Sequence, residues 1–206
     1  MNNQFAVPFN PEAAMKAGGG DFISEGGAYA VEIISAKYVT AGTGSRGMEF
    51  EIVTDSGQKA KFITIYYKKS DGSIINSGYS TLCGIMFFLG LQGLSMQNAG
   101  ADSFAPELAG AKVGMFLQKV LYTKNDGGEG YKFDIRAPFK ADTLHTVREA
   151  QENKQPSAIQ NWINSYQDKD DRKPMSQPAN TGGFGAPANQ PQPVNNFDSF
   201  GDDIQF

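Results

Sequence analysis

Hydrophobic and polar residues alternate strictly along residues 48–52, where Met48, Phe50 and Ile52 fall on one side and two glutamates on the other. A period of two residues predicts a strand with one buried face. Residues 28–39 and 58–67 are two further runs rich in β-branched and aromatic residues. We therefore expect three consecutive strands, with the second and third joined as a hairpin.

The turn of this hairpin is expected at Asp55, Ser56 and Gly57, because a three-residue turn places glycine in the left-handed conformation. This turn length sets the register. Phe50 should then face Phe62 on the core side. On the other side Glu51 should face Lys61, and such an opposite-charge pair contributes roughly a few tenths of a kcal/mol.

Residues 80–91 are apolar on nearly every side, which is typical of a buried helix. Ser80 or Thr81 is the expected N-cap, and Gly90 is the expected stop. Residues 95–106 carry no periodic pattern and are expected to form a loop.

Two more strands are expected at residues 112–123 and 129–139. The first should direct three apolar side chains inward: Val113, Met115 and Leu117. Five strands with a helix between the third and the fourth is the order of the OB fold. The sequence therefore predicts a mainly β domain over residues 28–140, with an OB-like five-stranded barrel.

The turn between these last two strands is expected at residues 125–128. That turn places Tyr122 opposite Tyr131, so that two aromatic rings meet beside it. The same register places Lys119 opposite Asp134.

Outside this domain, composition divides the chain into three parts. Residues 1–27 are rich in Gly, Ala and Asn and predict a flexible arm, residues 141–173 predict a helical extension, and residues 174–206 predict a disordered linker and acidic tail. The extension carries an apolar stripe at helical spacing: Ile159, Trp162, Ile163 and Tyr166. We expect the stripe to pack on the barrel, with base stacking and a dimer contact as alternatives.

The net charge of −4 excludes a generally basic surface, but residues 27–140 hold 12 basic and 10 acidic residues, which is compatible with a local basic groove. A single cysteine, Cys83, suits a reducing compartment, and its apolar surroundings predict an inert core thiol. The N-terminus shows no secretory signal, and no apolar run is long enough to span a bilayer. The expected location is the cytoplasm.

Catalytic or metal-binding chemistry finds little support in the sequence. The one histidine, His145, lies in a polar stretch, and no His/Cys cluster has the spacing of metal ligands. We expect neither an enzyme nor a cofactor, and we expect no metal.

Binding of a nucleic-acid strand has better candidates, because OB barrels hold single strands between the first–second and fourth–fifth strand loops. Basic and aromatic side chains gather at and beside these loops: Lys37, Tyr38, Arg46, Lys59, Lys61, Tyr66, Tyr67, Lys68, Lys69, Lys119, Tyr122, Lys124, Tyr131 and Lys132. Lysine and arginine neutralise phosphates, and ring faces stack on bases. Each tyrosine could equally be an ordinary strand residue. The strongest local candidate is the Tyr122/Tyr131 pair beside Lys124.

Acidic and large apolar residues are interspersed over the last dozen residues, without helical or strand spacing. Such a segment cannot fold alone and is expected to dock on a partner protein. The side chains expected to make the contact are Phe197, Asp198, Phe200, Asp202, Asp203, Ile204 and Phe206. Residues 202–206 resemble the acidic tip of bacterial single-stranded DNA-binding proteins, which typically ends Asp-Asp-Ile-Pro-Phe. Here Gln205 stands in place of the proline.

A second, longer resemblance runs over residues 28–139 and is most evident at 107–114 and 122–127. It is similar to phage-encoded single-stranded DNA-binding proteins with an OB-like barrel. Together the resemblances imply sequence-independent binding and protection of single-stranded DNA in the host cytoplasm, during phage DNA replication or recombination, with enzymes recruited through the tail. A protein-interaction adaptor and an RNA-binding chaperone are the alternatives, and a homo-oligomer stays open.

Overall fold

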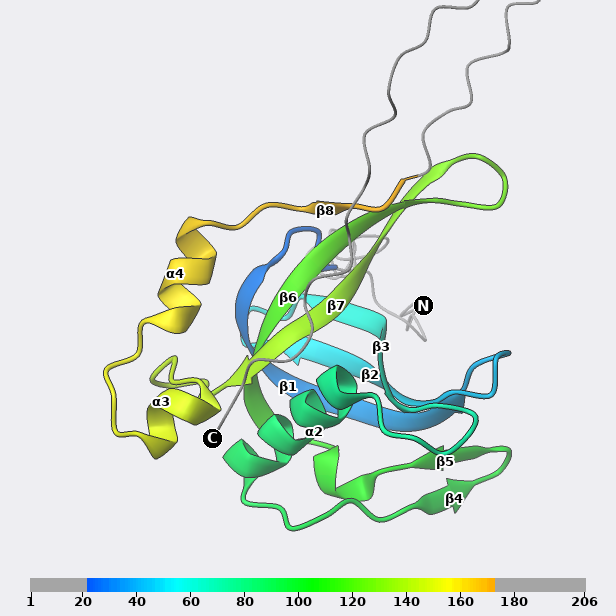
Figure 1. The fold of residues 1–206 in the computed structure, drawn as a ribbon, viewed down its shortest axis with the longest axis horizontal. Coiled ribbons are helices and arrows are strands. Elements are labelled where there is room, and N and C mark those ends of the chain that lie inside the picture. Colours follow the sequence, from blue (N-terminus) through cyan, green and yellow to red (C-terminus); the bar gives the residue numbers. More distant parts are fainter. Residues whose placement is uncertain (1–21, 173–206) are drawn as a thin grey trace, which may run out of the picture. The chain divides into compact units, whose positions relative to one another are not determined.

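Five long antiparallel strands form the framework of the protein, which was analysed as a computed structural model and is described for residues 22–172. In chain order they are β1 (Gly27–Thr40), β2 (Arg46–Thr54), β3 (Lys59–Lys68), β6 (Lys112–Thr123) and β7 (Glu129–Phe139). β1 is central. β2 pairs with β1 along one edge, and β6 pairs with the N-terminal half of β1 along its other edge. The resulting order, β3-β2-β1-β6-β7, is mainly β and antiparallel (Figure 1).

The two outer strands, β3 and β7, lie in contact with each other, but no ladder of hydrogen bonds joins them among the described residues. The sheet is therefore curled but not closed. Helix α2 (Asn76–Leu89) packs against both outer strands, beside the seam between them (Figure 1).

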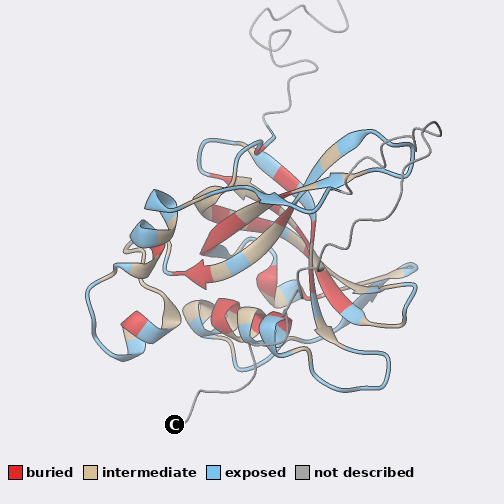
Figure 2. Cartoon of the chain, turned by 45° about the horizontal axis from the view of Figure 1, so that its top comes forward, coloured by how far each residue is buried: buried red, intermediate tan, exposed pale blue. Residues whose placement is uncertain are grey.

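The main core lies between the inner faces of these strands and α2, where one side of each strand is apolar. Its largest fully buried side chains include Phe50, Ile52, Ile63, Ile85 and Met115. Figure 2 shows the buried segments along the middle of the strands and on one side of α2, with the turns exposed. Val113, Met115 and Leu117 are all buried, as the pattern predicts.

Helix α2 begins earlier than expected, at Asn76 instead of near residue 80, and its preceding residue Ile75 gives no side-chain cap. The expected stop is confirmed, because Gly90 adopts the left-handed conformation with φ 66°. The prediction of a helix buried all round is wrong: Tyr79 and Phe87 are exposed and Cys83 is half-buried. The helix covers the sheet with one side only.

Close packing of α2 on β3 depends on Gly78. A Cβ atom built there would lie 2.0 Å from the main-chain oxygen of Tyr66, a distance that no real contact allows. Glycine at this position thus allows the first turn of the helix to lie directly against the β3 backbone.

We expect Gly78→Ala to destabilise the protein by about 1–3 kcal/mol, because the helix must move away from β3. Inside a helix without neighbours the same change would stabilise by about 1 kcal/mol. A loss of stability would therefore show that the clash with β3 outweighs the gain in helix propensity. Urea unfolding measures the effect, with Ser80→Ala, on the exposed side of the same helix, as the control. A Gly78→Ala variant as stable as the natural protein would contradict the close packing.

Residues 95–106, expected to be a loop, contain a small hairpin of β4 (Gln97–Ala99) and β5 (Asp102–Phe104). β5 pairs with the C-terminal half of β1 and extends the sheet there. A short 3-10 helix, η1 (Pro106–Leu108), then leads into β6. Strands of three residues are too short to show alternation, which is why the sequence pattern misses them.

The C-terminal part of the described chain packs on the outer face of β6. It contains α3 (Val147–Gln151), α4 (Ala158–Asn164) and β8 (Lys169–Asp170), which pairs with β6. Ile159 forms a second small core with Phe116 and Phe139, against which Trp162 and Tyr166 pack. The expected packing of the apolar stripe on the sheet is confirmed for these residues, whereas Ile163 is exposed. No helix within residues 22–172 is long and apolar enough to cross a membrane.

Candidate nucleic-acid interface

A β-bulge in β3 changes which side chains reach the surface. Ile52 pairs with Ala60 as the turn predicts, but Phe50 pairs with Ile63, so one extra residue of β3 lies between these two pairs. The expected Glu51–Lys61 ion pair forms, with 2.9 Å between nitrogen and oxygen. The expectation that Phe62 faces the core is wrong: its side chain is 76% exposed, because the bulge gives its core position to Ile63.

The β6–β7 hairpin is also shifted by one residue from the expected register. Tyr122 pairs with Gly130, and Leu121 pairs with Tyr131. The turn holds one residue fewer than expected, because the amide of Lys124 donates to the carbonyl of Gly128 at 2.7 Å and leaves only residues 125–127 between them. By the same shift Lys119 pairs with Phe133 and not with Asp134.

The shift still leaves both tyrosines beside one hollow, because Gly130 carries no side chain. A Cβ atom at Gly130 would lie 2.9 Å from Cζ of Tyr122, so the Tyr122 ring occupies the space above this glycine. Tyr131 packs edge-on against Phe133, with ring centres 5.6 Å apart, and its hydroxyl lies 3.5 Å from the carbonyl oxygen of Ile23.

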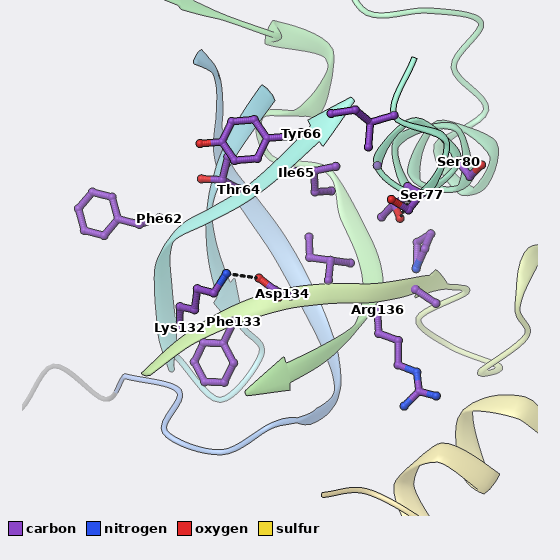
Figure 3. A pocket seen from close by; sticks show the side chains of 16 residues that line it. Phe62, Thr64, Ile65, Tyr66, Ser77, Ser80, Lys132, Phe133, Asp134 and Arg136 are labelled. Carbon is purple, nitrogen blue, oxygen red and sulfur yellow. Dashed lines mark hydrogen bonds and ion pairs between the residues drawn. The ribbon is translucent and has the colours of Figure 1, made fainter. Parts of the chain in front are cut away.

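Two hollows lie end to end along the seam between β3 and β7 and share Phe62, Lys132 and Phe133. The helix-side hollow, of about 820 Å³, reaches the start of α2 (Figure 3); its other lining residues are Thr64, Ile65, Tyr66, Ile75, Ser77, Gly78, Ser80, Thr81, Asp134, Ile135, Arg136, Ala137 and Pro138. The turn-side hollow, of about 410 Å³, is completed by Phe22, Ile23, Lys59, Ala60, Lys61, Tyr122 and Tyr131. We call the two together the seam groove.

The turn-side hollow combines positive charge with exposed aromatic rings. Its three lysines are Lys59, Lys61 and Lys132, and no carboxylate is among its lining residues. Four of its aromatic side chains are exposed: Phe22, Phe62, Tyr122 and Tyr131. Ammonium groups attract phosphates, and exposed rings offer flat faces to bases. The hollow therefore has the groups needed to bind a chain that carries both negative charges and flat rings.

The helix-side hollow adds hydroxyl groups and one further cation. Arg136 lies over the Trp162 ring at 4.7 Å, a cation–π contact that holds the guanidinium beside the groove. Figure 3 shows Lys132 directed toward Asp134, and their charged atoms are 3.3 Å apart. Tyr66 is exposed on the opposite wall.

The structure thus gathers six of the predicted binding residues in the seam groove: Lys59, Lys61, Tyr66, Tyr122, Tyr131 and Lys132. Four others lie near strand ends or turns, outside the two hollows: Arg46, Lys68, Lys69 and Lys124. Arg46 and Lys68 face each other across the β2–β3 ladder, which places two like charges side by side.

The remaining four predicted residues make structural contacts. The carboxylate of Asp102 accepts a hydrogen bond from Lys37 and raises the pKa of that lysine. Tyr38 donates to the carbonyl of Ser95 at 3.0 Å, and burial raises its pKa. Tyr67 packs against the main core.

Lys119, the fourth of them, is enclosed. Its side chain is 14% exposed, and its ammonium group lies 3.4 Å from Glu25, 3.6 Å from Asp168 and 5.2 Å from the centre of the Tyr131 ring. This lysine supports the Tyr131 ring from within the protein.

Four aromatic or basic groove residues were missed by sequence reasoning: Phe22, Phe62, Phe133 and Arg136. Strict alternation assigns Phe62 to the core, and only the bulge reverses it. Phe22 follows a glycine-rich arm and carries no periodic signal. The predicted partner-binding residues of the tail, at 197–206, lie outside the described residues.

Other chemistry is sparse in the part of the chain that is described. Within residues 22–172 no group of three His, Cys, Asp or Glu side chains could hold a metal ion. The His145 ring is hydrogen-bonded to the Thr143 hydroxyl at 2.8 Å, away from the seam groove. The seam groove is therefore the candidate site. No family model matches the chain, and no curated protein matches it in sequence.

Proposed function

We propose that this protein binds single-stranded DNA along the seam groove without sequence preference. The observation that carries the proposal is the turn-side hollow, where three lysines and four exposed aromatic rings meet; the carboxylates paired with Lys61 and Lys132, those of Glu51 and Asp134, are not among its lining residues. Lysines attract the phosphates of any sequence, and each ring stacks on any base for about 1–3 kcal/mol. This chemistry needs no metal or cofactor.

An OB-like module is part of the same proposal. The chain order of the five long strands, with α2 between the third and the fourth, supports it, although the β4–β5 hairpin and η1 also lie between α2 and β6. The position of the turn-side hollow beside the β6–β7 turn supports it as well. The turns that follow β1, β4 and β6 project to the same side in Figure 1, so loops from different parts of the chain flank that side. The open seam between β3 and β7 is the departure from a closed barrel.

The biological role we infer is protection of single strands during replication or recombination, most like that of a phage protein in its host. The acidic residues 202–206 would recruit partner enzymes, which raises their local concentration at exposed DNA. This part of the proposal depends on the sequence resemblance alone.

The test of DNA binding is a salt titration with fluorescent oligo-dT. Neutralising a phosphate of a single strand contributes about −0.7 to the slope of log affinity against log salt. Because three lysines line the turn-side hollow, we expect Lys59→Ala/Lys61→Ala/Lys132→Ala to make the slope less steep by about 2 and to weaken binding about tenfold or more at low salt.

The matched control is Lys112→Ala/Lys140→Ala/Lys154→Ala, which removes three exposed, ion-paired lysines outside the groove. A natural protein whose affinity did not change from low to high salt would overturn the electrostatic part of the proposal. Tighter binding of RNA than of DNA of matched sequence would favour an RNA chaperone, and no binding of either would favour a protein adaptor.

A further inference from the structure

Phe62 combines two unfavourable features in one residue. Its backbone has φ 61°, in the left-handed region that aromatic residues rarely adopt because Cβ crowds the carbonyl. Its ring is 76% exposed, so it gains little from burial. Glycine is the usual residue for a left-handed position in a bulge. The backbone conformation of Phe62 therefore costs free energy, and its exposed side chain adds little to the stability of the fold.

Strain of this kind persists where the surrounding structure imposes it, and it occurs often at binding sites. Here the imposing structure is the bulge itself. Ala60 and Ile63 are both buried on the core side, two of the anchors that hold β3 on either side of Phe62. Figure 3 shows the ring projecting clear of β3.

The position of Phe62 along the groove is equally specific. It lines both hollows of the seam groove, and it also lines a third hollow, together with Lys37, Phe104 and the carboxylates of Glu49 and Glu51. A polymer that follows the seam from the turn-side to the helix-side hollow must pass this ring. Within residues 22–172 Phe62 makes no ring–ring or cation–π contact, in contrast to Tyr131, which packs on Phe133. Its faces are therefore open to a ligand.

We propose that Phe62 is a stacking platform for one unpaired base, and that the groove selects strands with accessible base faces over duplexes and over bare sugar-phosphate chains. This inference rests on the proposed function. A base inside a duplex has both faces covered by its neighbours, and exposing one costs unstacking energy. Lys61 and Lys132 beside the ring then exchange their ion pairs with Glu51 and Asp134 for the phosphates on either side of the stacked base.

The first experiment replaces Phe62 with glycine, which accepts the left-handed backbone without strain. We expect Phe62→Gly to bind oligo-dT about tenfold more weakly, since one stacking contact is lost. We expect its midpoint of urea unfolding to be equal or higher, so weaker binding cannot be attributed to misfolding. Phe87→Ala is the control, because it removes an exposed ring on α2 outside the seam groove.

The second experiment uses Phe62→Trp as a fluorescent reporter, compared with the natural protein, which contains only Trp162. Stacking on a base should quench the new signal when oligo-dT is added. An abasic oligonucleotide of equal length offers no base to any of the rings, so it should bind to the natural protein about 1000-fold more weakly and give little quenching of the Phe62→Trp variant. Duplex DNA should behave like the abasic chain.

The outcomes separate the two proposals. If the natural protein does not bind oligo-dT at all, both the proposed function and the platform are wrong. If the natural protein binds but Phe62→Gly binds equally well, or if Phe62→Trp is quenched equally by abasic DNA, the platform alone is overturned. Weaker binding of Phe62→Gly together with base-dependent quenching supports it.

Discussion

Replacing Tyr122 and Tyr131 together with leucine should weaken binding of oligo-dT by about 100-fold. Each ring that stacks on a base contributes about 1–3 kcal/mol, and the two act in the same hollow. Leucine retains apolar bulk beside Gly130 and Phe133, so the hairpin keeps its packing while the flat faces are lost. Fluorescence anisotropy at fixed salt measures the change.

The control for this variant is Tyr79→Leu, because Tyr79 is an exposed tyrosine of α2 that lies outside both hollows. Its affinity should equal that of the natural protein. If the double variant remained folded and bound as tightly as the natural protein, the two tyrosines would be ordinary strand residues.

Glu149→Gln should lower the free energy of unfolding by about 2–3 kcal/mol. The side chain is 7% exposed, and its carboxylate accepts hydrogen bonds from the amides of Thr146, Ser157 and Ala158 at 2.8–2.9 Å. It thereby joins the start of α3 to the start of α4. Burial raises the pKa of Glu149, but these hydrogen bonds outweigh it and lower the pKa to about 2.

The lowered pKa makes this contribution depend on pH. A carboxyl group whose pKa is lower in the folded than in the unfolded state stabilises fully above its unfolded pKa, and the stabilisation is lost as pH falls through the folded value. The natural protein should therefore lose this contribution between about pH 5 and pH 2, and Glu149→Gln should lose less.

Urea unfolding at several pH values tests this expectation. Glu152→Gln, which alters an ion-paired carboxylate near the end of α3, is the control and should cost only about 0–1 kcal/mol. A Glu149→Gln variant with unchanged stability at pH 7 would show that the carboxylate does not join the two helices.

Long elements could be predicted from the sequence because their patterns extend over many residues. The strands at 112–123 and 129–139 agree with β6 and β7 residue for residue. Registers were less predictable, since one residue more in a bulge or one fewer in a turn shifts every pair beyond it. The β6–β7 turn, closed between Lys124 and Gly128, pairs Tyr122 with Gly130 instead of Tyr131, and the bulge in β3 turns the Phe62 side chain away from the core.

The candidate site was also only partly predictable from the sequence. Lysines and tyrosines near the expected loops were identified by type and position, and six of them line the seam groove. Whether a given lysine meets solvent or a carboxylate depends on tertiary contacts that no local pattern records. Lys119 illustrates this, because its neighbours Glu25 and Asp168 come from distant parts of the chain.

The open seam would allow the width of the proposed binding surface to change. Where hydrogen bonds join two strands, their spacing is fixed at about 4.8 Å, and any widening breaks the ladder. Between β3 and β7 only side chains and α2 set the spacing. A rotamer change is therefore enough to alter the width of the groove, at far lower cost than a broken ladder. In the proposed function, large purines and small pyrimidines would then both fit the same surface, as binding without sequence preference requires.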